Sequence, residues 1–297
     1  MSSAPRPGAH GGDGLAVAHA LGLDPRTVVD LSMSLNPFAP DVAAITARHL
    51  DAVGRYPDAR AATSALAEAI GVPVEEVVLT NGGSEAIALV AAARGGTVVA
   101  EPEFALHPRA TGGPRWRSNP HNPSGALAAA TEVADVWDEA FYPLATGEWT
   151  RGDRDAVVVG SLTKVFACPG LRLGYVLGAD AARLADAQPE WPVSTLALAV
   201  LLDLLAVADL PAWRVAIATR RRELVSLLVD HDLPATERDA PWVLVDAPGL
   251  RDRLAPEGVI VRDCASFGWP DVVRIAVPDD RGFDRLVGAL HRTQERP

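Results

Sequence analysis

The chain has 297 residues, 48% of them hydrophobic, with a formal net charge of −11 and a pI near 5.1. This length accommodates one large domain and a smaller one, and the negative charge argues against nucleic acid as a partner. Cys168 and Cys264 are too few for a disulfide framework or a metal site, residues 1–14 lack the apolar run of a signal peptide, and stretches such as 196–205 are too short to span a membrane. We therefore expect a cytoplasmic protein without metal, membrane or nucleic-acid partners.

Helix-like and strand-like patterns alternate along the chain. Short apolar runs bounded by turn residues predict strands, and longer runs with helical periodicity predict helices. In chain order we expect a helix at 61–70, a strand at 77–79, a helix at 84–93, strands at 97–100, 133–137, 156–159 and 171–177, a long helix at 195–229, strands at 243–245, 259–261 and 272–277, and a helix at 283–291. Such alternation is typical of an α/β sheet with helices on both faces, followed here by a compact α+β region.

Lys164 is the only lysine in the chain, beside 26 arginines. Arginine serves as well as lysine for surface charge, salt bridges and anion binding, but its guanidinium stays protonated and cannot form an imine. One retained lysine is therefore either a survivor in an arginine-rich composition or a primary amine that the protein requires. Composition alone leaves both interpretations open.

The residues around Lys164 favour the second interpretation. Lys164 follows Ser161 by three residues, just after the strand expected at 156–159, and Arg172 comes eight residues later. Ligands gather at the carboxyl ends of strands in open α/β sheets, and a hydroxyl and a fixed cation suit a phosphate dianion. The pattern resembles the class I and II aminotransferases, which belong to the fold type I enzymes dependent on pyridoxal 5′-phosphate (PLP). The alternative is a surface lysine near a turn.

This resemblance implies a Schiff base between PLP and Lys164, with Ser161 and Arg172 at the cofactor phosphate. A second element, Thr80-Asn81-Gly82-Gly83-Ser84, places a glycine pair between an expected strand and an expected helix. Free backbone N–H groups at such a turn can bind phosphate. In the family's phosphate loop, Gly83 and Ser84 occupy the binding positions.

Three further residues match positions around the cofactor ring. Asn122, in Asn119-Pro120-His121-Asn122-Pro123-Ser124-Gly125, would hydrogen-bond the phenolic oxygen of PLP. Asp138 would pair with the protonated pyridine nitrogen, which makes the ring an electron sink. Phe104 would stack on the ring, although ordinary core packing also explains an aromatic residue there. Phe141 stands where the family usually has a tyrosine, so one hydrogen bond to the phenolic oxygen is expected to be absent.

The resemblance also implies how substrate and subunits are bound. Arg274 matches the arginine that forks onto the substrate carboxylate. Tyr56, in Arg55-Tyr56-Pro57-Asp58, matches the tyrosine that reaches the phosphate in the other subunit. The expected active unit is thus a homodimer with shared active sites.

Finer resemblance is to the L-threonine-O-3-phosphate decarboxylases of cobalamin synthesis. It rests on His10-Gly11-Gly12-Asp13, on Leu31-Ser32-Met33-Ser34-Leu35-Asn36-Pro37, on Asp-Glu-Ala-Phe at 138–141, and on the segment 261–267 with its Arg-Asp-Cys. It implies that His10, Asn36 and Arg262 contact the substrate, with His10 and Arg262 at a substrate phosphate. The alternatives are a disordered tail for His10 and a surface ion pair with Asp263 for Arg262.

The expected fold is that of a fold type I PLP enzyme. Residues 1–40 would form an N-terminal arm and part of the small domain, 41–205 a large PLP-binding domain with a mostly parallel sheet, and 206–297 a small C-terminal α+β domain. Only short intervals separate Phe104 from Asn119 and Gly125 from Asp138, where relatives carry a strand and a helix in each. The large domain is therefore expected to be trimmed, with a helix or strand missing.

The expected function is that of a PLP-dependent lyase, like the threonine-phosphate decarboxylases, acting on a small amino acid, either phosphorylated or unphosphorylated. The alternative is an aminotransferase resembling histidinol-phosphate aminotransferase, which would need a 2-oxo acid as cosubstrate. The same residues serve both reactions, so the motifs leave the choice open. A PLP-sensing regulator would need a DNA-binding domain, and the aminotransferase-like pattern already begins by residue 10. A non-catalytic scaffold is the remaining alternative.

Overall fold

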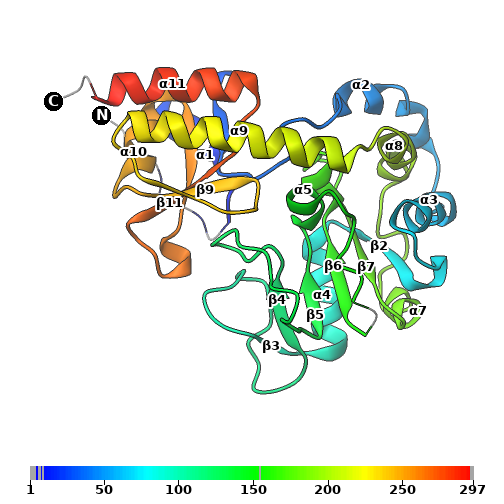
Figure 1. The fold of residues 1–297 in the computed structure, drawn as a ribbon. Helices are drawn as coiled ribbons and strands as arrows, with labels where there is room; N and C mark the ends of the chain where they lie inside the picture. Colours follow the sequence, from blue (N-terminus) through cyan, green and yellow to red (C-terminus); the bar gives the residue numbers. More distant parts are fainter. Residues whose placement is uncertain (1–4, 6–7, 9, 154, 295–297) are drawn as a thin grey trace. The chain divides into compact units, whose positions relative to one another are not determined.

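The computed structural model describes residues 5, 8, 10–153 and 155–294. The chain forms two compact units (Figure 1). Unit 1 comprises Met1–Pro37, Pro123–Gly125 and Val215–Pro297, and unit 2 comprises Phe38–Asn122 and Ala126–Arg214. The division falls within helix α9 (Leu210–Asp230), whereas the domain boundary expected at residue 205 precedes that helix.

Unit 2 contains a six-stranded sheet in the order β2-β7-β6-β5-β4-β3. The strands are β2 (Val77–Asn81), β3 (Thr97–Val98), β4 (Arg115–Ser118), β5 (Val136–Asp138), β6 (Val157–Gly160) and β7 (Leu173–Leu177). Strands β3, β4, β5 and β6 are parallel, and β7 is antiparallel to both of its neighbours. The expected α/β fold with a mostly parallel sheet is confirmed.

Helices cover both faces of this sheet, because alternate residues of its strands enter different cores. Val158 of β6 packs into a core that also holds Leu66 and Leu201. Its neighbours Val157 and Val159 enter a second core. The helices of unit 2, including short 3₁₀ turns, are α2 (Val42–Ala47), η2 (Leu50–Gly54), α3 (Arg60–Ile70), η3 (Val74–Glu76), α4 (Gly83–Arg94), α5 (Tyr142–Thr146), α6 (Leu162–Val165), α7 (Ala181–Ala185) and α8 (Thr195–Ala206). Leu66 and Leu201 place α3 and α8 on one face, while Ile87 and Leu184 place α4 and α7 on the other.

The two intervals that look trimmed in the sequence each contain a strand and no helix. All residues of 99–114 and 119–135 are described, and these segments join β3 to β4 and β4 to β5 without helical turns. Arg151 contacts the second interval and the strand at its end: its guanidinium is 4.7 Å from the Trp137 ring centroid and donates to the Glu132 carbonyl at 2.8 Å. Each interval thus keeps its strand and has no helix.

Unit 1 contains a five-stranded sheet in the order β1-β10-β11-β9-β8. Its strands are β1 (Val29–Leu31), β8 (Ala235–Glu237), β9 (Trp242–Asp246), β10 (Val259–Asp263) and β11 (Val272–Ala276). Strand β1 is parallel to β10, and the remaining pairs are antiparallel. This mixed sheet agrees with the expected α+β region.

The helices of unit 1 are α1 (Gly14–Leu21), η1 (Pro25–Thr27), the main part of α9, α10 (Leu250–Leu254), η4 (Ala255–Glu257), η5 (Ala265–Phe267) and α11 (Asp280–Gln294). Helices α9 and α11 pack together (Figure 1). Leu228 and Leu286 share a core with Val243 and Val261 of the sheet. Arg220 joins the same two helices at their surface, where it pairs with Asp280.

Some expected boundaries are wrong. The helix expected at 195–229 is two helices, because Asp209 accepts a hydrogen bond from Ala212 N and starts α9 after the break at 207–209. The strand expected at 133–137 is shorter and comprises Val136–Asp138. Strand β4 escapes notice because Arg-Trp-Arg-Ser carries no apolar run.

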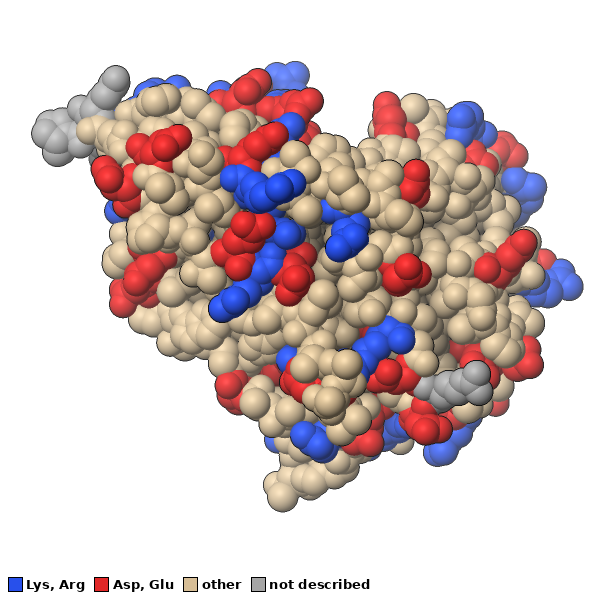
Figure 2. Space-filling view, in the orientation of Figure 1, with Lys and Arg blue, Asp and Glu red and all other residues tan. Residues whose placement is uncertain are grey.

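No single helix in the described ranges is long and apolar enough to cross a membrane. Helices α8 and α9 reach the length and apolar composition of a membrane span only when taken together, and they are bent by 83° at the break between them. On the face drawn in Figure 2, basic and acidic side chains are interspersed over each unit.

Candidate active site

The polar residues of unit 2 cluster at the carboxyl ends of its parallel strands. Ser118 of β4, Asp138 of β5 and Val159 of β6 are neighbours in register. Ser161 follows Val159 by two residues and is the N-cap residue of α6, and Lys164 lies within that helix. Because all three strands run in the same direction, their ends bring these side chains to one edge of the sheet.

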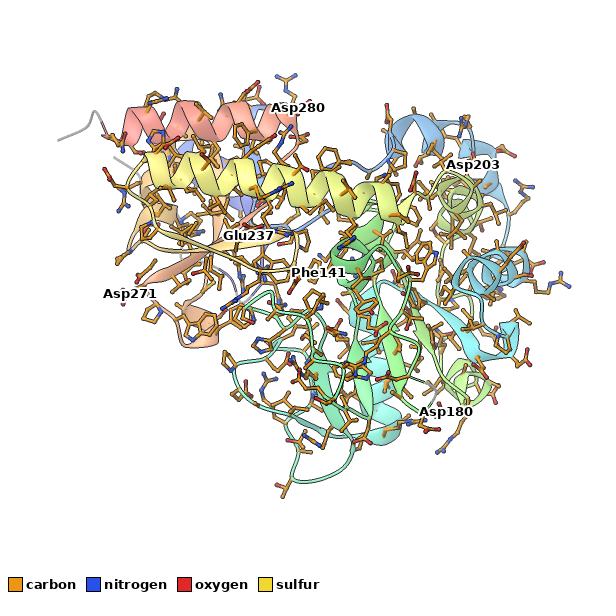
Figure 3. All side chains as sticks on the ribbon, in the orientation of Figure 1. Phe141, Asp180, Asp203, Glu237, Asp271 and Asp280 are labelled. Atoms are coloured by element: carbon orange, nitrogen blue, oxygen red, sulfur yellow. The ribbon has the colours of Figure 1, made fainter. Side chains whose placement is uncertain are left out.

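Lys164 lies in the single turn of α6 and is half-buried. Its backbone N–H donates to the Ser161 carbonyl at 3.1 Å, and its Nζ lies 5.9 Å from the ring centroid of Phe141. Phe141, at the start of α5 (Figure 3), is buried. The amine thus stands beside an aromatic face at the point where the family's tyrosine is replaced by phenylalanine.

The glycine-rich turn, the serine and the arginine meet in one place. A Cβ atom at Gly82, whose φ is +80°, would lie 2.4 Å from Nη2 of Arg172, and one at Gly83 would lie 3.3 Å from Cβ of Ser161. Gly83 begins α4, so its first backbone N–H groups have no acceptor within the helix. Ser84 is exposed in this first turn. Together these groups form a cluster of donors next to a guanidinium, which is a chemistry suited to phosphate.

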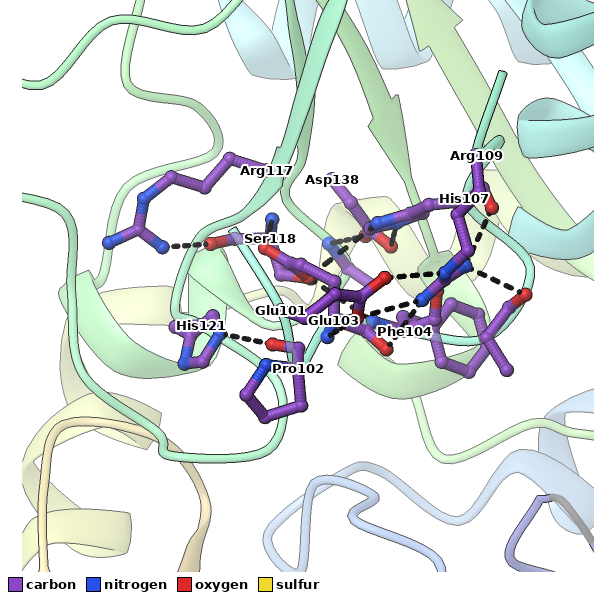
Figure 4. Close-up of polar contacts among 12 residues, drawn as sticks. Glu101, Pro102, Glu103, Phe104, His107, Arg109, Arg117, Ser118, His121 and Asp138 are labelled. Carbon is purple, nitrogen blue, oxygen red and sulfur yellow. Dashed lines mark hydrogen bonds and ion pairs between the residues drawn. The ribbon is translucent and has the colours of Figure 1, made fainter. Parts of the chain in front are cut away.

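Asp138 belongs to a buried polar cluster that the motifs did not reveal (Figure 4). Its Oδ2 lies 2.9 Å from Nε2 of His107, and its Oδ1 accepts a hydrogen bond from Ala140 N at 3.0 Å. His107 is buried, and its ring lies 5.5 Å from that of Trp116. No motif in the sequence includes His107. Its position three residues after Phe104, a candidate for the cofactor site, is the sequence feature that could have indicated it.

The remaining cofactor candidates of unit 2 occupy different settings. Phe104 is half-buried, and its ring centroid lies 5.7 Å from that of His107 in an edge-on arrangement. Asn122 is buried at the end of its turn. Tyr56 is 78% exposed and packs on Trp191, with ring centroids 4.6 Å apart. Tyr56 therefore presents its ring to the outside of its own unit.

Arg262 and Arg274, the two arginines expected at the substrate, are in unit 1 and are direct partners on neighbouring strands. Arg262 of β10 pairs in register with Arg274 of β11, and both are buried, at 4% and 6% exposure. Burial lowers the pKa of Arg274 to about 10, and Arg262 beside it acts in the same direction. Burial also lowers the pKa of Arg262. Two like charges thus occupy paired positions in a dry site, where Arg262 disfavours the charged form of Arg274.

Contacts hold each of these arginines in place. Arg262 donates to Ser266 Oγ at 3.0 Å and to the Gly8 carbonyl at 3.2 Å. The guanidinium of Arg274 lies 4.7 Å from the ring centroid of Trp242. The alternative of a surface ion pair does not describe Arg262, because its side chain is not at the surface.

The segment around His10 packs on the segment around Asn36. A Cβ atom at Gly11 would lie 2.4 Å from the Ser32 carbonyl oxygen, and Gly12 N donates to Ser32 Oγ at 2.8 Å. His10 is exposed at a bend, and Asn36 is buried at 2% exposure. All four substrate candidates belong to unit 1, and all cofactor candidates belong to unit 2.

Comparison with known proteins identifies the family. Residues 116–290 match the model of the family described as aminotransferase class I and II. Histidinol-phosphate aminotransferase of Halorubrum lacusprofundi is 30% identical, with 93% of this chain and 92% of the relative covered. Threonine-phosphate decarboxylase of Salmonella typhimurium is 28% identical, with 95% of each covered.

A solved structure shares the fold. Histidinol-phosphate aminotransferase from Sinorhizobium meliloti, in complex with pyridoxal 5′-phosphate, matches with a TM-score of 0.82 at 17% identity, covering 94% of each chain. The alignment to the Halorubrum relative extends over 340 positions, which exceeds the whole length of this chain, so this chain carries gaps in it. From the match over most of its length, the chain belongs to the class I and II aminotransferase family.

Proposed function

We propose that this chain is a PLP-dependent lyase that decarboxylates a small phosphorylated amino acid. Membership of the family supports PLP as cofactor. The names of its relatives support the substrate class, because threonine phosphate and histidinol phosphate both join an amine to a phosphate. The role in cobalamin synthesis that the sequence resemblance implies is part of this proposal.

The residues of unit 2 fit the cofactor. The contact of Arg172 with Gly82 leaves no room for a side chain there, and the adjacent start of α4 supplies N–H donors. Gly83, Ser84 and Ser161, with Arg172, would hold the phosphate. Asn122 and Phe104 would contact the ring, and Lys164 would carry the cofactor through its amine. Donors at one end and a carboxylate at the other match a molecule that has a phosphate and a basic nitrogen.

When bound, PLP supplies an electron sink for the pair released at the substrate Cα. Asp138 would keep a proton on the ring nitrogen by accepting its hydrogen bond. His107, at 2.9 Å, orients Asp138 for that task. The Lys164 amine would transfer protons at the substrate Cα.

The observation that carries the substrate proposal is the pairing of Arg262 with Arg274. Two guanidinium groups are buried at paired positions of β10 and β11, and burial lowers the pKa of each. A substrate with both a carboxylate and a phosphate offsets both charges. Arg274 would bind the carboxylate through a bidentate fork, and Arg262, with Asn36 and His10, would bind the phosphate.

The test is incubation of the holoenzyme with L-threonine-O-3-phosphate and with unphosphorylated L-threonine. We expect CO₂ release from the phosphorylated substrate without an added 2-oxo acid, and little from the other. If neither of these substrates nor any other phosphorylated amino acid releases CO₂, decarboxylation is the wrong reaction.

Aminotransfer is the second candidate, and the name of the 30% identical relative favours it. This reaction needs a 2-oxo acid and passes the amino group to the cofactor. Incubation with histidinol phosphate alone would then convert the cofactor to its pyridoxamine form, without CO₂. Added 2-oxo acid would restore the original absorbance. The same samples therefore separate the two reactions.

We also propose that the active unit is a homodimer with shared sites. Tyr56 and Trp191 form an exposed aromatic pair, and Leu50 and Val53 nearby in sequence are 59% and 68% exposed. An exposed apolar group of this kind favours a protein partner. Sedimentation should give a dimer. Mixing a Tyr56→Ala chain with a Lys164→Ala chain should restore part of the activity that each lacks, whereas a monomeric active enzyme would contradict the proposal.

A further inference from the structure

A buried polar chain extends from Asp138 into the segment between β3 and β4 (Figure 4). One nitrogen of His107, Nε2, lies 2.9 Å from Asp138 Oδ2, and the other, Nδ1, lies 3.6 Å from Glu103 Oε2. The side chains of His107 and Glu103 are 0% and 1% exposed. In the part of the chain that the structure describes, Nδ1 has no hydrogen-bond acceptor or donor. Two carboxylates therefore face the two nitrogens of one imidazole, away from water.

The surroundings of Glu103 favour its ionised form. Ser118 N donates to Oε1 at 2.9 Å, and the Ser118 hydroxyl donates to Oε2. Phe104 N also donates to Oε2, at 3.2 Å. A carboxylate that accepts several hydrogen bonds is stabilised as the anion. A buried anion in turn needs a cation close by.

The imidazole of His107 can supply that cation. A neutral ring that donates through Nε2 to Asp138 would turn the lone pair of Nδ1 toward Glu103 Oε2, so that two acceptors would face each other in a dry site. A proton on Nδ1 converts this repulsion into attraction. At 3.6 Å the contact is an ion pair, longer than a hydrogen bond.

We propose that Glu103 is a positioning residue that holds a proton on Nδ1 of His107, so that a charged ring donates through Nε2 to Asp138. The series Glu103, His107, Asp138 then alternates in sign. The charge on His107 keeps Asp138 ionised. The lone pairs of Asp138 that do not accept from His107 then point away from the imidazole.

The other charged groups nearby act on the backbone of this segment. Arg109 donates to four of its carbonyl groups, at 2.8 to 3.3 Å, and pairs with Glu101 at 2.7 Å. Arg109 thereby lowers the pKa of Glu101, whose side chain is 56% exposed. Glu101 reaches His107 only through its more distant charge. Glu101 is therefore a matched control for Glu103: it is a glutamate of the same segment with no contact to the imidazole ring.

The consequence for the cofactor rests on the proposed function, because it requires Asp138 to face the ring nitrogen of PLP. The charge of His107 does not depend on it and can be measured directly. We would label the full chain with ¹⁵N-histidine and record the ring nitrogens with PLP bound and after its removal. The signals of His107 are identified as those missing in His107→Gln.

In the wild type near neutral pH, both nitrogens of His107 should show the shifts of a protonated ring. In Glu103→Gln the ratio of charged to neutral ring should fall at least about tenfold, the effect of one unit in proton affinity. Glu103→Asp should restore part of the charged form. Glu101→Gln should leave His107 unchanged.

A neutral His107 in the wild-type protein overturns the proposal by itself, whether or not any variant folds. A charged ring that persists in Glu103→Gln, or that Glu101→Gln removes equally, assigns the effect to something other than Glu103 and overturns it as well. Failure of the proposed function looks different, because Lys164 would then acquire no cofactor, whatever the charge of His107.

Discussion

Unit 2 buries charges that alternate in sign, whereas unit 1 buries two charges of the same sign at paired positions. His107 contacts the carboxylates of both Glu103 and Asp138, and each contact is an ion pair when the ring carries the charge that we propose. Arg262 and Arg274 face each other across β10 and β11. The first arrangement is close to balanced within the protein and can be formed before any ligand binds. The second places two cations at paired positions of one sheet, where, in our proposal, the anionic groups of the substrate bind.

In our proposal unit 2 carries the cofactor chemistry and unit 1 binds the substrate, and variants can test this division. The largest effect is expected for Lys164→Arg. The variant keeps the charge but has no amine that can react with an aldehyde, so visible absorbance from bound cofactor and turnover should both fall to background. Lys164→Ala should behave in the same way.

Absorbance spectra and product assays of these two variants provide the check. Borohydride treatment of the wild type adds a chemical one, because Lys164 is the only lysine in the chain and any side-chain adduct must be found there. An active Lys164→Arg enzyme would mean that covalent cofactor chemistry is not what this protein does.

Arg274→Gln should affect the substrate and leave the cofactor unaffected. Loss of one partner of a buried charge pair costs about 2 to 5 kcal/mol, so kcat/KM should fall about thirtyfold or more. The absorbance of bound cofactor should stay as in the wild type. Arg274→Lys keeps the charge and loses the planar fork, so it should recover only part of the activity. Loss of cofactor from either variant would contradict the proposed division of roles, in which unit 1 binds substrate and unit 2 binds cofactor.

Glu139 of unit 2 departs from the alternating pattern, because burial raises its pKa to about 7. An unfolded chain releases this proton near 4.5, whereas the folded chain keeps it to about 7. Unfolding therefore releases a proton in this interval, and the free energy of unfolding falls as pH rises through it, by on the order of 2 kcal/mol.

Glu139→Gln should remove this dependence. Urea unfolding of both proteins at about pH 5 and about pH 7.5 measures it: the wild type should lose stability between the two conditions, and the variant should lose less. Parallel behaviour of the two proteins would show that Glu139 does not carry the effect.

The smallest effect is expected for Arg262→Gln, and it sharpens the roles within unit 1. If Arg262 binds the substrate phosphate, the variant should lose about tenfold in kcat/KM for a phosphorylated substrate, the value of a charged hydrogen bond. Activity on an unphosphorylated analogue should change little. Arg274→Gln should reduce both activities equally. Equal losses in Arg262→Gln would place Arg262 at the carboxylate or in a purely structural role.

Local sequence patterns determined much of the fold and pointed to several residues of the candidate cofactor site, whose roles stay predictions. A strand, a glycine pair and a helix start occupy consecutive positions, so the turn at Gly82 could be predicted from the chain alone. Lys164 and Arg172 are eight residues apart, in the short segment from α6 to the start of β7. The single lysine is a property of composition. Each of these features is contained within a short stretch, where local backbone preferences decide the structure.

Only the tertiary structure decided which distant residues meet. Arg262 and Arg274 become partners through the register of β10 and β11, and His107 reaches Asp138 because two parallel strands end at the same edge. No periodicity marks Glu103 or His107, since both lie in an irregular segment. Pairing of this kind depends on strand register and on the burial of polar groups against one another, which are properties of the packed chain and are not encoded in any one stretch of it.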